Sequence, residues 1–206
     1  MVEPTYHEEE KLKKKGYLKI AGLDEAGRGA WAGPIVASSV ILNPRVRIDG
    51  LRDSKKLTPT KRKQLYLEIV KNALNWSVGI VPEKTIDRIG INEANALAME
   101  QSVKRLLLQP DYLLIDYFLL DHVGIDHHAI VKGDQKVASI AAASIIAKVT
   151  RDYIMIAAHK DHPEYSFHTH KGYGTDHHKK KIKQHGTSRI HRMSFSPMKD
   201  LVQENK

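Results

Sequence analysis

The sequence feature that most constrains the fold is an apolar stretch rich in alanine over residues 137–158 (VASIAAASIIAKVTRDYIMIAA). It predicts a long helix, and its small side chains allow that helix to pack closely against a sheet. In the preceding part of the chain, short apolar runs alternate with helical patterns, which is typical of an α/β fold. The first two runs are so close together that an antiparallel pair, and therefore a mixed sheet, is expected.

Turn residues and apolar spacing divide the chain into elements. Strands are predicted within 17–27, 34–42, 76–81, 111–116 and 129–131. Helices are predicted at 61–74, 83–89, 92–108, 137–158 and 176–185. Thr58 or Thr60 is the predicted N-cap of the first helix. We expect Leu97, Val103 and Leu107 to form the inner stripe of the helix at 92–108.

A chain of 206 residues is long enough for one compact domain with a short appendage. The first 16 residues are polar, and we expect residues 1–16 to form a flexible extension. A single domain is predicted over residues 17–206, ending in a helical appendage at about 176–206. No internal repeat is present in the sequence.

Composition excludes several kinds of site. The chain has no cysteine, which rules out disulfides, thiolate metal sites and cysteine nucleophiles. It has 33 basic and 24 acidic side chains, a formal charge of +9 and a pI near 9.5, so a polyanion is a reasonable partner. The charged start lacks the apolar core of a signal peptide, and no run approaches the ~18 apolar residues of a membrane span. We therefore expect a cytoplasmic protein without a membrane segment.

Four carboxylates lie where apolar runs end. Asp24 and Glu25 follow the first run, Asp116 closes another, and Asp134 comes just after a third. If these strands are neighbours, their ends meet at the edge of the sheet where ligands usually bind in α/β folds. Crowded carboxylates repel each other, and a divalent cation removes the conflict. Oxygen ligands suit Mg²⁺ or Mn²⁺, and two such ions about 3.5–4 Å apart support in-line displacement at phosphorus.

A structural role is the alternative for each of these carboxylates. An aspartate at the end of a strand commonly serves a turn or a helix cap, and Asp134 is well placed to cap the helix that follows it. The adjacent pair Asp24 and Glu25 is less ordinary, because burying either charge without a partner is costly. Taken alone, these residues leave both the metal site and the structural roles open.

Several short motifs together resemble a known family. DEAGRGAWAGP (24–34) closely resembles the opening motif of the type 2 ribonucleases H, in particular bacterial ribonuclease HII. The resemblance continues in the family's order through DSKKLT (53–58), LLID (113–116), KGD (132–134), ASIIAKVTRD (143–152), KGYGT (171–175) and HRMSF (191–195). It covers the chain from about residue 18 to residue 198, and the combination is far more specific than any single motif.

The resemblance implies a ribonuclease H-like fold, with a central mixed sheet flanked by helices and a small helical C-terminal part. It implies an endonuclease that cuts RNA paired with DNA, including single ribonucleotides within duplex DNA. A water activated by two ions of Mn²⁺ or Mg²⁺ would cut 5′ of the ribonucleotide and leave a 3′-hydroxyl and a 5′-phosphate. The family's acidic ligands correspond to Asp24, Glu25, Asp116 and Asp134.

The resemblance also assigns residues that contact the substrate. The family's GRG motif corresponds to Gly27, Arg28 and Gly29, which in the family read the 2′-hydroxyl largely through backbone groups. Glycine suits this task because it has no Cβ and lets the main chain approach a sugar closely. The family's junction-sensing tyrosine corresponds to Tyr173, which is set between two glycines.

The chain departs from the family's opening motif at two positions. Ala30 and Trp31 stand where proline and leucine are frequent, which affects local substrate fit more than chemistry. The related ribonuclease HIII fits less well, because it carries an additional substrate-binding domain before the catalytic one. Here about 17 residues precede the first predicted strand.

Three lysines are expected to contact substrate phosphates: Lys55, Lys56 and Lys171. The lysine-rich run over residues 179–183 is at least as consistent with a solvated helix face. The histidines offer an alternative metal site for zinc, at His127 and His128 or at His168 and His170. Without a clear ligand set, surface histidines are the simpler interpretation.

Two other classes of function are consistent with parts of the sequence. A basic module could hold hybrids or duplexes without cutting them, although it has no use for four converging carboxylates. A different ribonuclease H-like nuclease would share the fold but act on another nucleic acid. No obligatory protein partner is indicated, and we expect a monomer.

Overall fold

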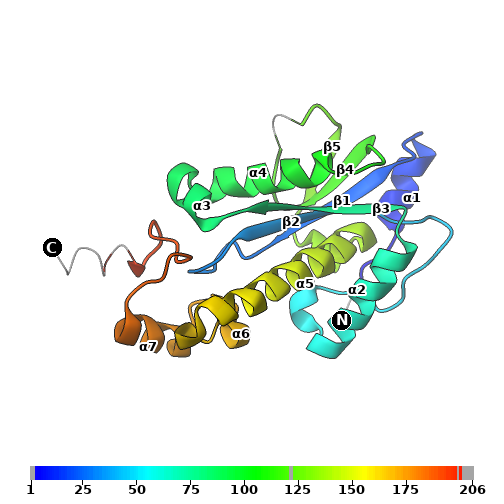
Figure 1. Cartoon of the computed structure of the whole chain (residues 1–206). Coiled ribbons are helices and arrows are strands. Elements are labelled where there is room, and N and C mark those ends of the chain that lie inside the picture. The colour runs from blue at the N-terminus through cyan, green and yellow to red at the C-terminus, as the bar shows by residue number, and fades with distance from the viewer. Residues whose placement is uncertain (1–2, 121–122, 199, 201–206) are drawn as a thin grey trace.

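Five strands form one mixed sheet at the centre of the molecule (Figure 1). The computed structural model describes residues 3–120, 123–198 and 200. The strands are β1 (Ile20–Ala26), β2 (Ile35–Ile41), β3 (Asn75–Val81), β4 (Tyr112–Asp116) and β5 (His127–Ile130), in the order β3-β2-β1-β4-β5. The pairs β1–β2 and β2–β3 are antiparallel, whereas β1–β4 and β4–β5 are parallel. The predicted α/β fold with a mixed sheet is confirmed.

Helices cover both faces of this sheet (Figure 1). One face carries α3 (Glu83–Ile89) and α4 (Ile91–Lys104), and the other carries α5 (Ala138–Asp161) and α2 (Pro59–Asn72). The remaining helices are α1 (His7–Lys14), α6 (Phe167–His170) and α7 (Asp176–His185), with 3₁₀ turns η1 (Ser54–Lys56), η2 (Gly133–Gln135) and η3 (Pro163–Tyr165). Among the described residues, no helix has the length and apolar character needed to cross a membrane.

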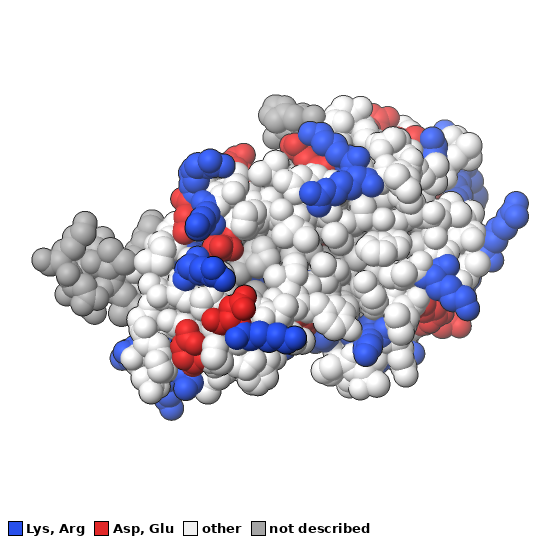
Figure 2. Space-filling view, in the orientation of Figure 1, with Lys and Arg blue, Asp and Glu red and all other residues white. Residues whose placement is uncertain are grey.

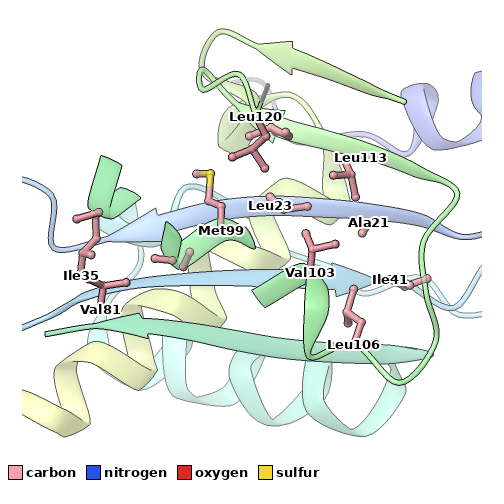
Figure 3. Close-up of a cluster of buried hydrophobic side chains, with 14 of the residues drawn as sticks. Ala21, Leu23, Ile35, Ile41, Val81, Met99, Val103, Leu106, Leu113 and Leu120 are labelled. Carbon is pink, nitrogen blue, oxygen red and sulfur yellow. The ribbon is translucent and has the colours of Figure 1, made fainter. Parts of the chain in front are cut away.

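The main hydrophobic core lies between the sheet and α4. Leu23 on β1 and Ile35 on β2 pack there with Met99 and Val103 of α4 (Figure 3). On the opposite face, Gly22 of β1 lets α5 approach closely, because a Cβ at this position would come within 2.1 Å of the α5 backbone. The alanines in the first half of α5 are buried, and α5 packs directly on β1, as the sequence predicts.

The N-terminal segment differs from the predicted flexible extension. Within residues 1–16, the structure forms α1 and buries Leu12 and Glu9 against the rest of the fold. One carboxylate oxygen of Glu9 accepts the main-chain N–H of Ser139 at 2.8 Å, and the carbonyl of Thr5 accepts that of Ala138 at 3.0 Å. These contacts satisfy N–H groups that the first turn of α5 cannot satisfy itself. Residues 1 and 2 lie outside the described residues.

Most other predicted elements agree with the structure within a few residues. The bounds of α3 and α7 are those predicted, and Thr58 is the N-cap of α2. The main error is at the end of α4, which stops at Lys104 and leaves Leu107 93% exposed instead of on an inner stripe. The predicted appendage at 176–206 contains α7, whose Ile182 packs with Phe167 of α6 and with Met198 in a smaller buried cluster. Residues 199 and 201–206 of that appendage lie outside the described residues.

The contact between α1 and the start of α5 gives a stability prediction. Replacing Glu9 by leucine should lower the free energy of unfolding by about 1–3 kcal/mol, because the buried N–H of Ser139 loses its acceptor. Glu9→Gln retains an acceptor and should recover most of this loss. Urea denaturation measures both, with Glu10→Gln as the exposed control on the same helix. A Glu9→Leu protein as stable as the wild type would show that α5 does not depend on α1.

Candidate active site

Three carboxylates from different segments converge at one edge of the sheet. The register of the parallel pair β1–β4 sets Leu23 opposite Ile115, and so brings Asp24 level with Asp116. The turn after β5 adds Asp134, and each of the three residues offers a carboxylate oxygen within 4.8 Å of the others. The main-chain N–H of Gly133 donates to Asp116 at 2.7 Å, which ties this turn to the end of β4. The structure thus brings together three of the four predicted acidic residues.

Glu25 lies beside this group rather than within it. Successive side chains of a strand point to opposite faces, so Asp24 faces Ser144 of α5 whereas Glu25 faces Asn95 of α4. The negative charge of Asp116 nevertheless reaches Glu25. Asn95 was not predicted. It is fully buried, and its side-chain amide lowers the pKa of the neighbouring Glu25 carboxyl.

Burial raises the pKa of all four predicted carboxyls, and the charges of neighbouring carboxylates add to the effect. Burial raises the pKa of Asp24 well above its usual value, and the charges of Glu25 and Asp116 raise it further. Burial, together with the charges of Asp116 and Asp53, raises the pKa of Asp134 to about 6. Burial also raises the pKa values of Asp116 and Glu25. Such a cluster favours the binding of protons or of cations.

A fifth carboxylate, which sequence reasoning missed, lies beside the cluster. Asp53 is buried, and it caps the η1 turn by accepting the main-chain N–H of Lys55 at 2.9 Å. Its charge acts on both Asp116 and Asp134. The other acids were predicted because they end apolar runs, and no such run precedes Asp53. The signal in the sequence that could have identified Asp53 is its position at the start of the DSKKLT motif.

Of the three predicted lysines, Lys55 lies closest to the acids. Burial lowers its pKa, but the charges of Asp24, Asp53 and Asp134 outweigh that effect and raise it. Lys56 is exposed on the same turn. Lys171 is half-buried, and its ammonium group donates to the carbonyl of His168.

The GRG segment forms a loop directly after β1. Gly27 is buried with φ of +94°, and a Cβ there would lie 2.0 Å from Nε of Arg151, so a side chain at this position would be strained and would displace the arginine. The Arg28 side chain donates to Asn92 on α4 at 2.6 Å, and its guanidinium lies 5.8 Å from the ring centre of Phe118. Gly29 is exposed, and a Cβ built on it meets no atom within 4 Å. The loop therefore presents bare main chain to solvent at Gly29.

Two fully buried arginines hold this loop, and neither was predicted to have a role. Arg151 of α5 and Arg192 of the C-terminal segment have no carboxylate in ion-pair contact among the described residues. Their guanidinium groups donate at 2.9–3.0 Å to main-chain carbonyls of Pro34, Lys171 and Ala32 from Arg151, and of Gly33 and Arg28 from Arg192. The motifs ASIIAKVTRD and HRMSF contain both arginines and were the only clue in the sequence.

The loop that carries Tyr173 lies against the GRG loop. The main-chain N–H of Trp31 donates to the carbonyl of Gly172 at 2.8 Å, and Ala30 forms a bridge with Tyr173. The guanidinium of Arg151 lies 5.0 Å from the centre of the half-buried Tyr173 ring. Two motifs that are distant in the sequence thus form one continuous surface.

The remaining charged and histidine-rich segments contribute no member to the aspartate group found among the described residues. On the face in Figure 2, basic side chains are interspersed with acidic ones. In the run 179–183, lysines at 179, 180 and 183 are exposed on α7. His127 and His128 lie on β5, and His168 is exposed whereas His170 is buried. Within the described part of the chain, the metal-ligand grouping is the aspartate trio and contains no histidine, so the zinc alternative gains no support.

Comparisons with known proteins agree with this geometry. Residues 21–198 match the family model described as Ribonuclease HII. The chain is 47% identical over 195 residues to ribonuclease HII of Caldicellulosiruptor saccharolyticus, covering 94% of this chain and 95% of that one. It is 50% identical over 194 residues to ribonuclease HII of Bacillus pumilus, covering 94% and 76%.

A solved structure shows the same fold. Ribonuclease H2 from Pyrococcus horikoshii superimposes with a TM-score of 0.77 at 28% identity, over 91% of this chain and 98% of that one. The family model and the relatives each cover most of the chain. The chain therefore belongs to the ribonuclease HII family.

Proposed function

We propose that this protein is an endonuclease that cuts RNA paired with DNA, including single ribonucleotides embedded in duplex DNA. Cleavage 5′ of the ribonucleotide leaves a 3′-hydroxyl and a 5′-phosphate. The observation that carries this proposal is the convergence of Asp24, Asp116 and Asp134 in a chain of the ribonuclease HII family. A module that only binds nucleic acid gains nothing from this cluster, because unneutralised carboxylates repel phosphate.

The acidic cluster fits divalent cations. Its donors are carboxylate oxygens, the ligands that Mg²⁺ and Mn²⁺ prefer. The raised pKa values of Asp24 and Asp134 reflect burial and repulsion, which a cation would offset. Asp24, Asp116 and Asp134 would hold the ions, with Glu25 completing the set from the other face of β1. Two bound ions would supply an activated water and would neutralise charge at phosphorus.

The adjacent loops are suited to recognise a ribose. The bare main chain at Gly29 leaves room for a sugar to approach, and only RNA offers a 2′-hydroxyl to its N–H and carbonyl groups. Arg151 and Arg192 fix the loop through its own carbonyls, so its shape exists before substrate binds. We propose that Gly27, Arg28 and Gly29 read the 2′-hydroxyl.

The residues around that loop complete the proposed substrate site. Tyr173 lies beside the GRG loop, where its ring can pack on the same sugar. Lys55 is the lysine most directly placed for the phosphate at the cleavage site, because it faces the acids and the Tyr173 hydroxyl. Lys56 and Lys171 would follow more distant phosphates, which contributes affinity without base preference.

Replacing one member of the acidic cluster should separate binding from cleavage. Asp134→Asn should lower single-turnover cleavage of a duplex with one ribonucleotide by about a thousandfold or more, because a cation ligand is lost. Its dissociation constant for that duplex, measured by fluorescence anisotropy, should stay within about threefold, because the loops are intact. Asp126→Asn, just before β5 at the opposite end of the parallel strands, is the control and should cleave normally. Full turnover by Asp134→Asn would refute the ligand assignment.

The same substitution should stabilise the metal-free protein. The pKa of Asp134 is raised to about 6 in the fold, so the unfolded chain binds fewer protons between about pH 4 and pH 6. Wild-type stability therefore falls as the pH rises through this window, whereas asparagine does not titrate. In EDTA at pH 7.5, Asp134→Asn should be more stable by about 1–3 kcal/mol in urea denaturation, with a smaller difference at pH 4.5. A variant less stable than wild type at pH 7.5 would show that the cluster is not repulsive.

The ends of the products test the nucleophile. If water attacks phosphorus and the 2′-hydroxyl is only recognised, the upstream fragment should end in a 3′-hydroxyl that a DNA polymerase extends without phosphatase treatment. The downstream fragment should begin with a 5′-phosphate attached to the ribonucleotide, as mass spectrometry can verify. A 2′,3′-cyclic phosphate would instead identify the 2′-oxygen as the nucleophile and contradict the mechanism.

A further inference from the structure

Three histidines of the C-terminal segments form a buried cluster for which the proposed chemistry has no use. His170 ends α6, His178 lies on α7 and His191 lies in the segment after α7. Both α6 and α7 lie beside the end of α5 (Figure 1). The rings of His170 and His178 stack with their centres 4.3 Å apart. The Nε2 atoms of His178 and His191 are 3.1 Å apart.

The hydrogen bonds fix the tautomers of His178 and His191. Nδ1 of His178 lies 3.0 Å from the carbonyl oxygen of Tyr173, which can only accept, so His178 carries its proton on Nδ1. Its Nε2 is therefore an acceptor, and Nε2 of His191 is the donor. Nδ1 of His191 accepts the main-chain N–H of Ser188 at 2.8 Å, which agrees with this assignment. A chain of hydrogen bonds, each donated in the same direction, thus runs from Ser188 through His191 and His178 to the carbonyl of Tyr173.

His170 holds the same loop at the preceding residue. Its Nε2 lies 2.7 Å from the carbonyl of Tyr165 and is a donor, so its Nδ1 accepts the main-chain N–H of Gly172 at 3.2 Å. The N–H of Gly172 and the carbonyl of Tyr173 are therefore each bonded to a histidine. These two groups lie on either side of the Gly172–Tyr173 peptide bond, so the histidines hold the main chain from which the Tyr173 ring projects.

The cluster is built to be neutral and free of metal. Each ring has one donating and one accepting nitrogen, so an added proton would place two donors face to face. Burial lowers the pKa of His178 to about 3 and that of His191 to about 4, which agrees with the geometry. The accepting lone pairs already receive N–H groups, so none is left for a metal ion.

The cluster also contacts the loop that follows the GRG motif. The Trp31 ring lies 5.6 Å from that of His178, and a Cβ built on Gly174 would meet the Trp31 ring at 2.3 Å. Trp31 is one of the two departures from the family's opening motif, and it fills the space between α7 and the Tyr173 loop. A movement of His178 would therefore reach Tyr173 both through the hydrogen bond and through this packing.

We propose that His178 and His191 are positioning residues that set Tyr173 against the substrate and thereby contribute to the recognition of a ribonucleotide within DNA. The inference rests on the proposed function, because it requires that Tyr173 contacts the substrate. The histidines act through the Tyr173 main chain and touch no reacting atom.

The first test compares two substitutions of one histidine. His178→Asn keeps an N–H near the position of Nδ1, whereas His178→Leu removes it. The readout is the ratio of kcat/KM for a DNA duplex with one ribonucleotide to kcat/KM for a continuous hybrid. His178→Leu should lower this ratio about tenfold, and His178→Asn should stay within about threefold of wild type. His168 is an exposed histidine on α6, and His168→Leu should leave the ratio unchanged.

Other outcomes of this comparison overturn the proposal. If His178→Leu keeps the ratio, or lowers activity on both duplexes equally, the histidine has only a structural role. A wild-type protein that cleaves neither duplex contradicts the proposed function itself, which is a different result. A double-mutant cycle tests whether the two residues act together. Tyr173→Ala should remove the selectivity, and adding His178→Leu to that variant should change the ratio by less than about twofold, because both residues act through one contact. Independent, multiplicative effects of the two substitutions on the ratio would contradict that coupling.

A spectroscopic test does not depend on activity or on any variant. Long-range ¹H–¹⁵N correlation spectra of the wild-type histidine rings report the tautomer directly. At pH 7, we expect the Nδ1–H tautomer for His178 and the Nε2–H tautomers for His170 and His191. A charged ring at any of these positions, or an Nε2–H tautomer at His178, would break the chain and refute the proposal.

Discussion

Repulsion among carboxylates at one edge of the sheet is the constraint on which the rest of the site depends. The strand register places Asp24 beside Asp116, and the turn after β5 brings Asp134 to both. Burial keeps water from screening their charges. Two features oppose this repulsion and keep the three aspartates together. The α5 backbone packs closely against Gly22, and the N–H of Gly133 donates to Asp116. A cation at this position would turn the repulsion into a bonding interaction, which links the fold to phosphodiester chemistry.

In the loops beside the acids, the buried charges are positive and are stabilised by hydrogen bonds instead of repelling each other. Arg151 and Arg192 are buried cations whose charges meet main-chain carbonyls instead of carboxylates. Charge-assisted hydrogen bonds offset the cost of burying them. Because their acceptors belong to the loops themselves, the arginines fix the backbone around Gly29 and Tyr173 in advance. Rigid loops that are formed before binding suit the recognition of a single hydroxyl group.

Local patterns in the sequence predicted what local physics controls. Apolar runs that end in acids located Asp116 and its partners, and turn residues set off α3 and α7. Interactions between distant segments were beyond such patterns. The buried bond from Glu9 to the start of α5 turned an expected extension into a helix, and Asp53 joined the acids from a loop without a strand before it. Leu107 was misplaced because α4 ends sooner than its apolar spacing suggests.

We propose above all that Asp24, Asp116 and Asp134 bind divalent ions. Crystals of the wild-type protein soaked in Mn²⁺ test it directly through the anomalous scattering of manganese. We expect anomalous peaks about 2.0–2.3 Å from carboxylate oxygens of Asp24, Asp116 and Asp134. Peaks at the histidines instead, or no peak at these aspartates in crystals that bind manganese elsewhere, would contradict it.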